Sequence, residues 1–255
     1  MILDVDGVAF TYRSTPVIQG VTFDLRPKQI LAILGPNGVG KTTLLKCMNA
    51  ILRPKAGSIM VEDLDLLTAD RMEIARRMGY VPQRSEAGRI TAFDAILLGR
   101  RPHIRWDVSD NDLRIVEAAI RMLRLEDLAL RYIDEMSGGE LQKVSIARAL
   151  VQEPRILLLD EPTSSLDLRN QLDILEIVRG VVTDHDVAAV MTMHDLNMAL
   201  RYADRFIFLK GGTICAAGGP DVVTAEMIET VYGVPVTVER YNGFQVVVPL
   251  TPTRD

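Results

Sequence analysis

Residues 30–48 read ILAILGPNGVGKTTLLKCM, and this stretch decides the fold. Five apolar residues come first, a glycine-rich turn follows, and apolar residues then recur at helical spacing. A short strand, this turn and a helix are the context in which the pattern G-x-x-x-x-G-K-[ST] binds phosphate. The stretch therefore predicts a phosphate-binding loop at residues 35–42, followed by a helix that reaches Leu52 and stops before Pro54.

The loop has the chemistry that a bound nucleotide requires. Glycines let main-chain N–H groups curl around phosphates, and the start of a helix adds partial positive charge. Lys41 supplies a point charge for the β- and γ-phosphates, and the Thr42 hydroxyl can bind Mg²⁺. An ordinary glycine-rich turn is the alternative, but the motif and its context agree. The predicted nucleotide-binding residues are Gly35, Pro36, Asn37, Gly38, Val39, Gly40, Lys41, Thr42 and Thr43.

A second apolar strand ends in two carboxylates, Asp160 and Glu161. The carboxyl end of a parallel strand faces the ligand crevice of an open α/β sheet. We expect Asp160 to hold Mg²⁺ and Glu161 to polarise the attacking water as a general base. The alternative is an acidic pair that only ends the strand and caps the next turn. The chain has no NKxD pattern, so recognition of guanine is unsupported.

The order of elements predicts an α/β fold. Alternating strands are expected at residues 2–12 and 21–25, before the loop, and strands alternate with helices again from residue 156. That alternation is typical of a mostly parallel sheet with crossover helices. Residues 84–151 read as a helical insertion, in which Asp110 or Asn111 would begin a long helix. Residues 234–255 would form a separate β-hairpin extension that turns at Asn242-Gly243.

Composition excludes several classes of protein. The net charge of −5 lacks the basic footprint of a nucleic-acid-binding domain, so no nucleic-acid partner is expected. No run approaches the roughly 18 apolar residues of a membrane span. The first residues, MILDVDGVAF, do not read as a signal peptide. Any work at a membrane would then be done through partners.

Five motifs occur together and in order: GPNGVGKTT, Gln83, MSGGELQ, LLLDEPTSSLD and His194. In order and spacing they resemble those of the ATP-binding cassette (ABC) ATPases, over almost the whole chain from Tyr12 to about Gly233. The resemblance implies a P-loop NTPase fold with an N-terminal antiparallel β subdomain and an inserted helical subdomain. It also implies ATP hydrolysis with Mg²⁺, in an ABC ATPase domain covering residues 1–233.

The resemblance also implies roles for single residues. Tyr12 matches the aromatic residue that stacks on adenine, although a tyrosine in an alternating strand is often a core residue. Gln83 matches the glutamine that touches Mg²⁺ and the water, with a polar turn residue as the alternative. His194 matches the histidine that contacts the γ-phosphate and orients Glu161. Asp167 matches the residue that crosses to the partner's site, and it is also a good helix N-cap.

A second phosphate-binding arrangement lies in residues 137–140, Ser-Gly-Gly-Glu, at the predicted start of a helix. The resemblance implies that Ser137, Gly138, Gly139 and Glu140 face the ATP of a second copy, in a homodimer that closes around two ATP molecules. Glu140 departs from the family's usual glutamine and adds negative charge. We therefore expect its carboxylate to turn away from the phosphate, towards an N–H at the helix start or towards the ribose.

Looser similarity points to one group of transporters. AFDAILLGRRPHIRW, RYADRFIFLKGGTICAAGGP and EMIETVYGVPV resemble the ATPase subunits of importers for iron-siderophores, haem and cobalamin. That implies permease subunits docked at the helical insertion, an extracytoplasmic solute-binding protein, and a peripheral position at the cytoplasmic face of the membrane. The alternative is an ABC ATPase of DNA repair, chromosome organisation or ribosome function. Against it, the chain has one cassette, no sustained heptads and only two distant cysteines.

Overall fold

The strand and helix around the glycine-rich loop form the centre of the computed structural model, which describes residues 1–83 and 88–250. The strand is the third in a sheet of six, of which five run parallel and the edge strand β10 runs antiparallel. In spatial order the strands are β10 (Thr213–Gly218), β9 (Arg205–Lys210), β3 (Ile30–Leu34), β8 (Ala188–Thr192), β7 (Ile156–Asp160) and β6 (Met78–Val81). Because the carboxyl ends of parallel strands meet at one edge, the residues that follow β3, β7 and β8 are brought together.

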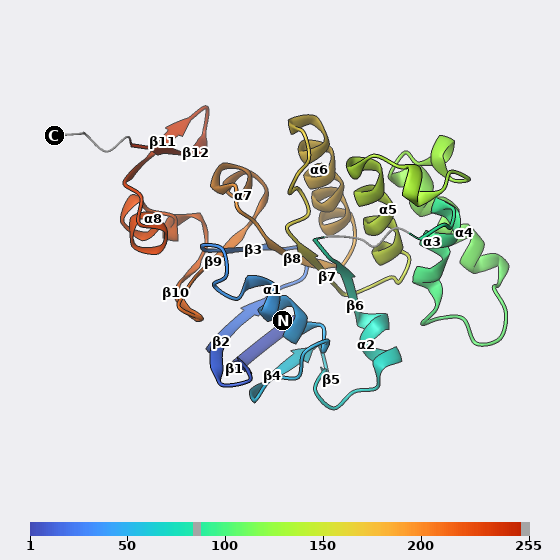
Figure 1. Cartoon of the computed structure of the whole chain (residues 1–255), viewed down its shortest axis with the longest axis horizontal. Helices are drawn as coiled ribbons and strands as arrows, with labels where there is room; N and C mark the ends of the chain where they lie inside the picture. The colour runs from blue at the N-terminus through green and yellow to red at the C-terminus, as the bar shows by residue number, and fades with distance from the viewer. Residues whose placement is uncertain (84–87, 251–255) are drawn as a thin grey trace.

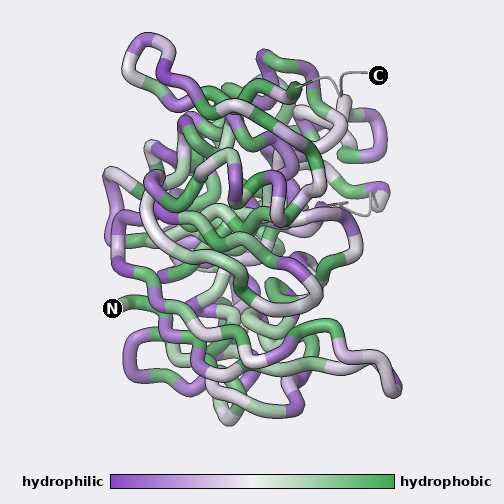
Figure 2. The backbone as a smooth tube through the Cα atoms, turned by 90° about the vertical axis from the view of Figure 1, so that its left-hand side faces the viewer, coloured by the Kyte–Doolittle hydropathy of each residue, from purple (hydrophilic) through white to green (hydrophobic). Residues whose placement is uncertain are grey.

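The three central strands β3, β7 and β8 are buried along their whole length. Alternate side chains of β3 enter different hydrophobic clusters, with Ile30 and Ala32 on one face and Leu31 and Ile33 on the other. A strand that is covered on both faces must be apolar throughout, which is why these strands read as continuous hydrophobic runs. In Figure 2 the hydrophobic segments run through the middle of the molecule, and hydrophilic stretches gather in outer loops.

One face of the sheet is covered by helix α1 (Lys41–Met48) and by a second, antiparallel sheet (Figure 1). The strands of that sheet, in spatial order, are β2 (Thr15–Leu25), β1 (Leu3–Tyr12), β4 (Ala56–Val61) and β5 (Leu64–Asp65). The prediction that α1 reaches Leu52 is wrong. The chain adopts a left-handed conformation at Ala50, and the N–H groups of Ile51 and Leu52 both turn back to the Lys46 carbonyl.

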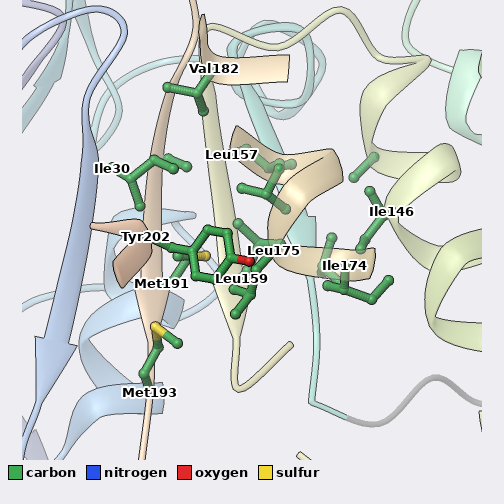
Figure 3. Packing of buried hydrophobic residues seen from close by; sticks show 14 of the residues in the cluster. Ile30, Ile146, Leu157, Leu159, Ile174, Leu175, Val182, Met191, Met193 and Tyr202 are labelled. Carbon is green, nitrogen blue, oxygen red and sulfur yellow. The ribbon is translucent and has the colours of Figure 1, made fainter. Parts of the chain in front are cut away.

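The other face is covered by helices that follow the sheet strands along the chain, α6 (Leu168–Asp184) and α7 (Leu196–Tyr202). Figure 3 shows Ile174 and Leu175 of α6 beside Leu157 and Leu159 of the sheet, with Tyr202 of α7 over Met191. These contacts anchor both helices on the sheet.

The helical insertion follows β6 and the short helix α2 (Arg71–Arg77). Its helices are α3 (Ala92–Leu97), η1 (Leu98–Arg100), α4 (Asp110–Met122), η2 (Glu126–Leu128), η3 (Ile133–Glu135) and α5 (Gly138–Leu150). Residues 84–87, where the insertion was predicted to begin, lie outside the described residues. The predicted N-cap of α4 is wrong: Ser109 caps it, because its hydroxyl accepts from the Asp112 N–H, and the Asp112 carboxylate accepts from the Ser109 N–H to complete a capping box.

The chain ends in a unit of one helix and one hairpin. After the short η4 (Pro220–Val222), these elements are α8 (Ala225–Tyr232), β11 (Val236–Tyr241) and β12 (Phe244–Pro249). Asn242 and Gly243 both have positive φ, 49° and 85°, as a type I′ turn requires. The hairpin and helices α3 and α4 lie towards opposite ends of the long axis of the molecule (Figure 1). Residues 251–255 lie outside the described part, and the division of the chain after Gly233 stays a prediction.

Within the described residues, no helix combines the length and the hydropathy that crossing a membrane requires.

Candidate active site

The glycine-rich loop joins β3 to α1 in a conformation that only glycine allows at two positions. Gly35 and Gly40 have φ of 147° and 109°. A Cβ atom at Gly35 would lie 2.5 Å from the Leu209 carbonyl oxygen, and one at Gly40 would lie 2.8 Å from the Ile18 side chain. Helix α1 starts directly after the loop and has no side-chain cap. The main-chain N–H groups of its first turn therefore face an anion site without a competing side chain.

Lys41 begins α1 and is only 5% exposed. Its ammonium group donates to the carbonyls of Gly35, at 2.7 Å, and Pro36, at 3.1 Å. Burial lowers the pKa of this lysine, while the nearby carboxylates of Glu161 and Asp160 oppose that shift. The lysine charge is thus held inside the loop, close to both predicted acidic residues.

Asp160 is buried at the end of β7, and one of its oxygens accepts two hydroxyl hydrogen bonds. Thr42 donates at 3.0 Å and Thr192 donates at 2.8 Å. Thr192 also accepts from the Glu161 N–H at 2.8 Å, so one threonine joins both acidic residues. Thr192 is not among the residues predicted from the sequence, although a hydroxyl that ends a wholly buried strand is a usable signal.

The Thr42–Asp160 pair also fits a magnesium ion. Its hydroxyl and carboxylate oxygens lie 3.0 Å apart, and hard oxygen ligands of this kind are those that Mg²⁺ prefers. No group of three or more metal-ligating His, Cys, Asp or Glu side chains occurs among the residues with assigned structure. A nucleotide site needs no such group, because Mg²⁺ there is held by one or two protein oxygens together with phosphates and water.

Glu161 sits where three predicted site residues meet. It follows β7 with a left-handed φ of 50°. One of its carboxylate oxygens accepts from the Gln83 amide, and the other contacts the His194 ring nitrogen Nε2. Gln83 follows β6 and His194 follows β8, so the two neighbours of β7 supply the two partners. Both partners restrict the carboxylate, whereas Gln83 makes no hydrogen bond to the Thr42–Asp160 pair.

Tyr12 lies at the end of β1 and is 46% exposed, so it is not the core residue that an alternating strand could have implied. Its ring makes an edge contact with Phe10, with the centroids 4.8 Å apart. Asp167 adopts the local role that was considered for it. It caps α6 by accepting from the Asn170 N–H at 2.8 Å.

The Ser-Gly-Gly-Glu segment begins α5, away from α1. Helix α5 packs on α3, α4 and β6, whereas α1 packs against β2 and β7. Ser137 is the N-cap, and the Glu140 carboxylate accepts from its N–H at 2.8 Å. These hydrogen bonds lower the pKa of Glu140. The carboxylate therefore points to an N–H at the helix start, one of the two directions that were expected. Gly139 leaves room for the Asn170 side chain, which a Cβ atom would meet at 2.9 Å.

Comparison with known proteins adds an independent line of evidence. A family model described as "ABC transporter" matches residues 18–164. An uncharacterized ABC transporter ATP-binding protein of Methanocaldococcus jannaschii is 53% identical over 250 residues, covering 98% of each chain. The hemin import ATP-binding protein of Gloeobacter violaceus is 38% identical, covering 98% of this chain and 94% of its own. The ferric enterobactin transport ATP-binding protein of Escherichia coli is 35% identical, covering 95% and 92%.

Solved structures agree with these relatives. A chain of a transporter described as being of the metal-chelate ABC type, in an inward-facing conformation, superposes with a TM-score of 0.87. It is 31% identical and covers 99% of this chain and 98% of its own. A dimeric ATP-binding cassette in a post-hydrolysis state with ADP and Pi has a TM-score of 0.77 and is 25% identical, covering 86% and 99%.

Proposed function

This chain belongs to the ABC transporter family, and we propose that it powers the uptake of an iron complex, siderophore or haem, or of cobalamin, through a separate membrane permease. The family and the relatives make the chain an ATP-binding and ATP-hydrolysing subunit. The observation that carries the proposal for the site is the meeting of Gln83, Glu161 and His194 beside the glycine-rich loop. A loop that only binds phosphate would not need this group.

The residues of the loop hold the triphosphate of ATP. Residues 35–43 supply main-chain N–H groups, and Lys41 contributes the charge that favours the β- and γ-phosphates. Thr42 and Asp160 would hold Mg²⁺, with Gln83 as a further candidate ligand. The ion would neutralise phosphate charge when it is bound. The exposed ring of Tyr12 offers a flat surface on which adenine stacks.

Glu161 acts as the general base for hydrolysis. Its carboxylate accepts a proton from the attacking water, while Gln83 and His194 hold it in one orientation. His194 also contacts the γ-phosphate, so it places the general base Glu161 near the bond that hydrolysis breaks. Thr192 fixes the main chain of Glu161 to Asp160, which keeps the base next to the Thr42–Asp160 pair.

Two copies close around two ATP molecules. Ser137, Gly138 and Gly139 start α5, which packs on α3, α4 and β6, and from this lobe they would face the γ-phosphate of a partner. Asp167 lies at the start of α6 and takes part in the same interface. A dimeric cassette with ADP and Pi is among the related structures, which supports this arrangement.

The permease contacts the helical insertion. Trp106 is 94% exposed and Leu98 is 58% exposed, so both apolar side chains on the insertion are available for contact with a permease. We place the chain at the cytoplasmic face of the membrane as a peripheral subunit, in a system that also contains an extracytoplasmic solute-binding protein. The names of the relatives favour import over the alternative in DNA repair or ribosome function.

One experiment tests the proposal. The chain is purified with its permease, and steady-state ATPase is measured with ferric siderophores, haem and cobalamin added in turn together with the binding protein. We expect one of these solutes to stimulate hydrolysis. Hydrolysis that none of them stimulates, in a complex that does hydrolyse ATP, would overturn the assignment of the solute. A complex without ATPase activity would overturn the proposal as a whole.

A further inference from the structure

The C-terminal unit, residues 225–249, contacts the active site at two places that are far apart in the sequence. The first contact is at the start of the glycine-rich loop. The Gly35 N–H donates to the Tyr232 hydroxyl at 2.8 Å. Tyr232 is the last residue of α8, and burial raises the pKa of its hydroxyl to about 12, so it stays neutral.

Gly35 also contacts the lysine of the loop. The carbonyl of the same glycine accepts from Lys41 at 2.7 Å. Two successive peptide groups are therefore held, one by Tyr232 and one by the lysine that we assign to the phosphates. If the Tyr232 hydroxyl is lost, the Gly35 N–H loses its partner in a partly buried place, and of these two hydrogen bonds only the one from Lys41 still holds the main chain at Gly35.

The second contact is made by helix α7, which follows His194 in the chain. Asn197, in the first turn of α7, pairs with the main chain of Val247 in β12. Its oxygen accepts from the Val247 N–H at 2.8 Å and its nitrogen donates to the Val247 carbonyl at 3.3 Å. An amide that pairs in this way acts as a neighbouring strand would. The Val247 side chain and Arg201, stacked over the Phe244 ring at 5.5 Å, add packing to the same contact.

His194 lies next to that contact in the chain. Asp195 caps α7 by accepting from the N–H groups of Asn197 and Met198, at 2.8 Å and 3.0 Å. The histidine directly precedes this cap, so the position of its ring follows the position of the helix. The helix in turn rests on β12 through Asn197.

We propose that the C-terminal unit is a positioning element of the ATP site, with Tyr232 holding the glycine-rich loop and Asn197 holding His194. This proposal rests on the function proposed above. It gives a role to a hairpin whose own residues suggest no catalytic or binding function. The two contacts act on different steps. Tyr232 acts on binding of the phosphates through Gly35, and Asn197 acts on hydrolysis through His194.

The test uses point variants of the full chain with its permease, because deletion of the hairpin would uncover the apolar surface against which Val236 and Val247 are buried. Tyr232→Phe should raise the Kd and KM for ATP about three- to tenfold, with little change in kcat, because one hydrogen bond is lost. The control is Tyr241→Phe, at an exposed position of the hairpin in the same C-terminal unit. A Tyr232→Phe variant with the KM of the control would overturn the role of Tyr232.

Asn197→Ala should lower kcat about three- to tenfold and leave the KM for ATP unchanged. The kcat is counted per nucleotide-binding site, from calorimetric titration, so that loss of folded protein does not imitate the effect. Exposed Asn111→Ala is the control. In a His194→Ala background, Asn197→Ala should have no further effect, because it acts through the histidine. Full additivity of the two changes would overturn the role of Asn197. If wild type itself lacks ATPase activity, the proposed function fails instead.

Discussion

The Glu140 carboxylate accepts hydrogen bonds from both the N–H and the hydroxyl of Ser137, each at 2.8 Å. The same hydroxyl proton is the one that the proposed dimer would offer to the γ-phosphate of the partner. Closure of the dimer must therefore exchange one acceptor for another at Ser137. The residue that departs from the family's usual glutamine thus competes directly with the phosphate.

Glu140→Gln should favour closure. A glutamine oxygen still accepts from the Ser137 N–H, so the capping box survives, but the negative charge beside the docking phosphate is gone. We expect ATP-driven dimerisation to tighten about two- to fivefold, measured by sedimentation with hydrolysis blocked by Glu161→Gln. Because the pKa of Glu140 is lowered, its carboxylate stays ionised at neutral pH, and its effect should not vary between pH about 6 and about 8. Weaker dimerisation would mean that the carboxylate helps the phosphate to dock.

Glu161→Gln should bind ATP but hydrolyse it about 10²- to 10⁴-fold more slowly, the usual range for loss of a general base. The amide keeps the shape of the carboxylate between Gln83 and His194 but cannot take a proton from water. The measurement is steady-state ATPase of the complex with the permease, together with calorimetric ATP affinity. Near-normal turnover would remove Glu161 from the role of base. A matched control is Glu239→Gln, on the exposed hairpin.

Lys41→Ala should weaken ATP binding by about 10- to 100-fold, because charge-assisted hydrogen bonds to phosphate are lost. The side chain lies inside the loop, where a lysine elsewhere in the chain could not take over its hydrogen bonds. Calorimetry of ATP and of ADP measures the effect, with Lys46→Ala, later on the same helix, as the control. Unchanged affinity for both nucleotides would contradict the phosphate-binding role of the loop.

Ser137→Arg should leave a folded chain that binds ATP but does not dimerise. The long cation would occupy the start of α5, where the partner's phosphate has to dock. Loss of the Ser137 cap costs about 1 kcal/mol. The control is therefore Asp70→Arg, which removes another N-cap with a capping box, at α2. The test is sedimentation with ATP in the Glu161→Gln background. ATP-driven dimers of the Ser137 variant would contradict the proposed trans contact.

Prediction from the sequence was most accurate where a single loop, strand or turn has its own local pattern of residues. The loop between β3 and α1, the buried strand that ends at Asp160, and the Asn242-Gly243 turn all have local signatures, and the structure has the predicted elements at each place. The early end of α1 was missed because the left-handed residue, Ala50, is not one that normally signals a helix end.

Such local patterns do not predict contacts between segments that are far apart in the sequence. Thr192 joins Asp160 to Glu161 only because β8 lies beside β7, and Tyr232 reaches Gly35 across 197 positions of the chain. Neither residue belongs to a motif. The direction of the Glu140 carboxylate could be predicted because a glutamate three residues after an N-cap serine has a local partner.

The last prediction concerns the stability of the helical insertion. Asp112 is buried against Arg100, whose Nε donates to it at 2.8 Å, and it also accepts from the Ser109 hydroxyl and N–H. The Ser109 and Arg100 hydrogen bonds lower its pKa to about 2, against about 3.9 in an unfolded chain. A lowered pKa contributes stability that is present above pH about 4 and is lost as the pH falls towards 2.

Asp112→Asn should therefore lower the free energy of unfolding by about 2 kcal/mol at neutral pH, because Arg100 loses its buried charged partner. The gap between wild type and variant should narrow as the pH falls below about 4, since the wild-type carboxylate then becomes neutral too. Urea unfolding over that pH range measures both curves. Asp110→Asn, exposed in the first turn of the same helix, is the control and should follow wild type closely. A gap that stays constant down to pH about 3 would show that the lost stability comes from packing and not from the ionised carboxylate.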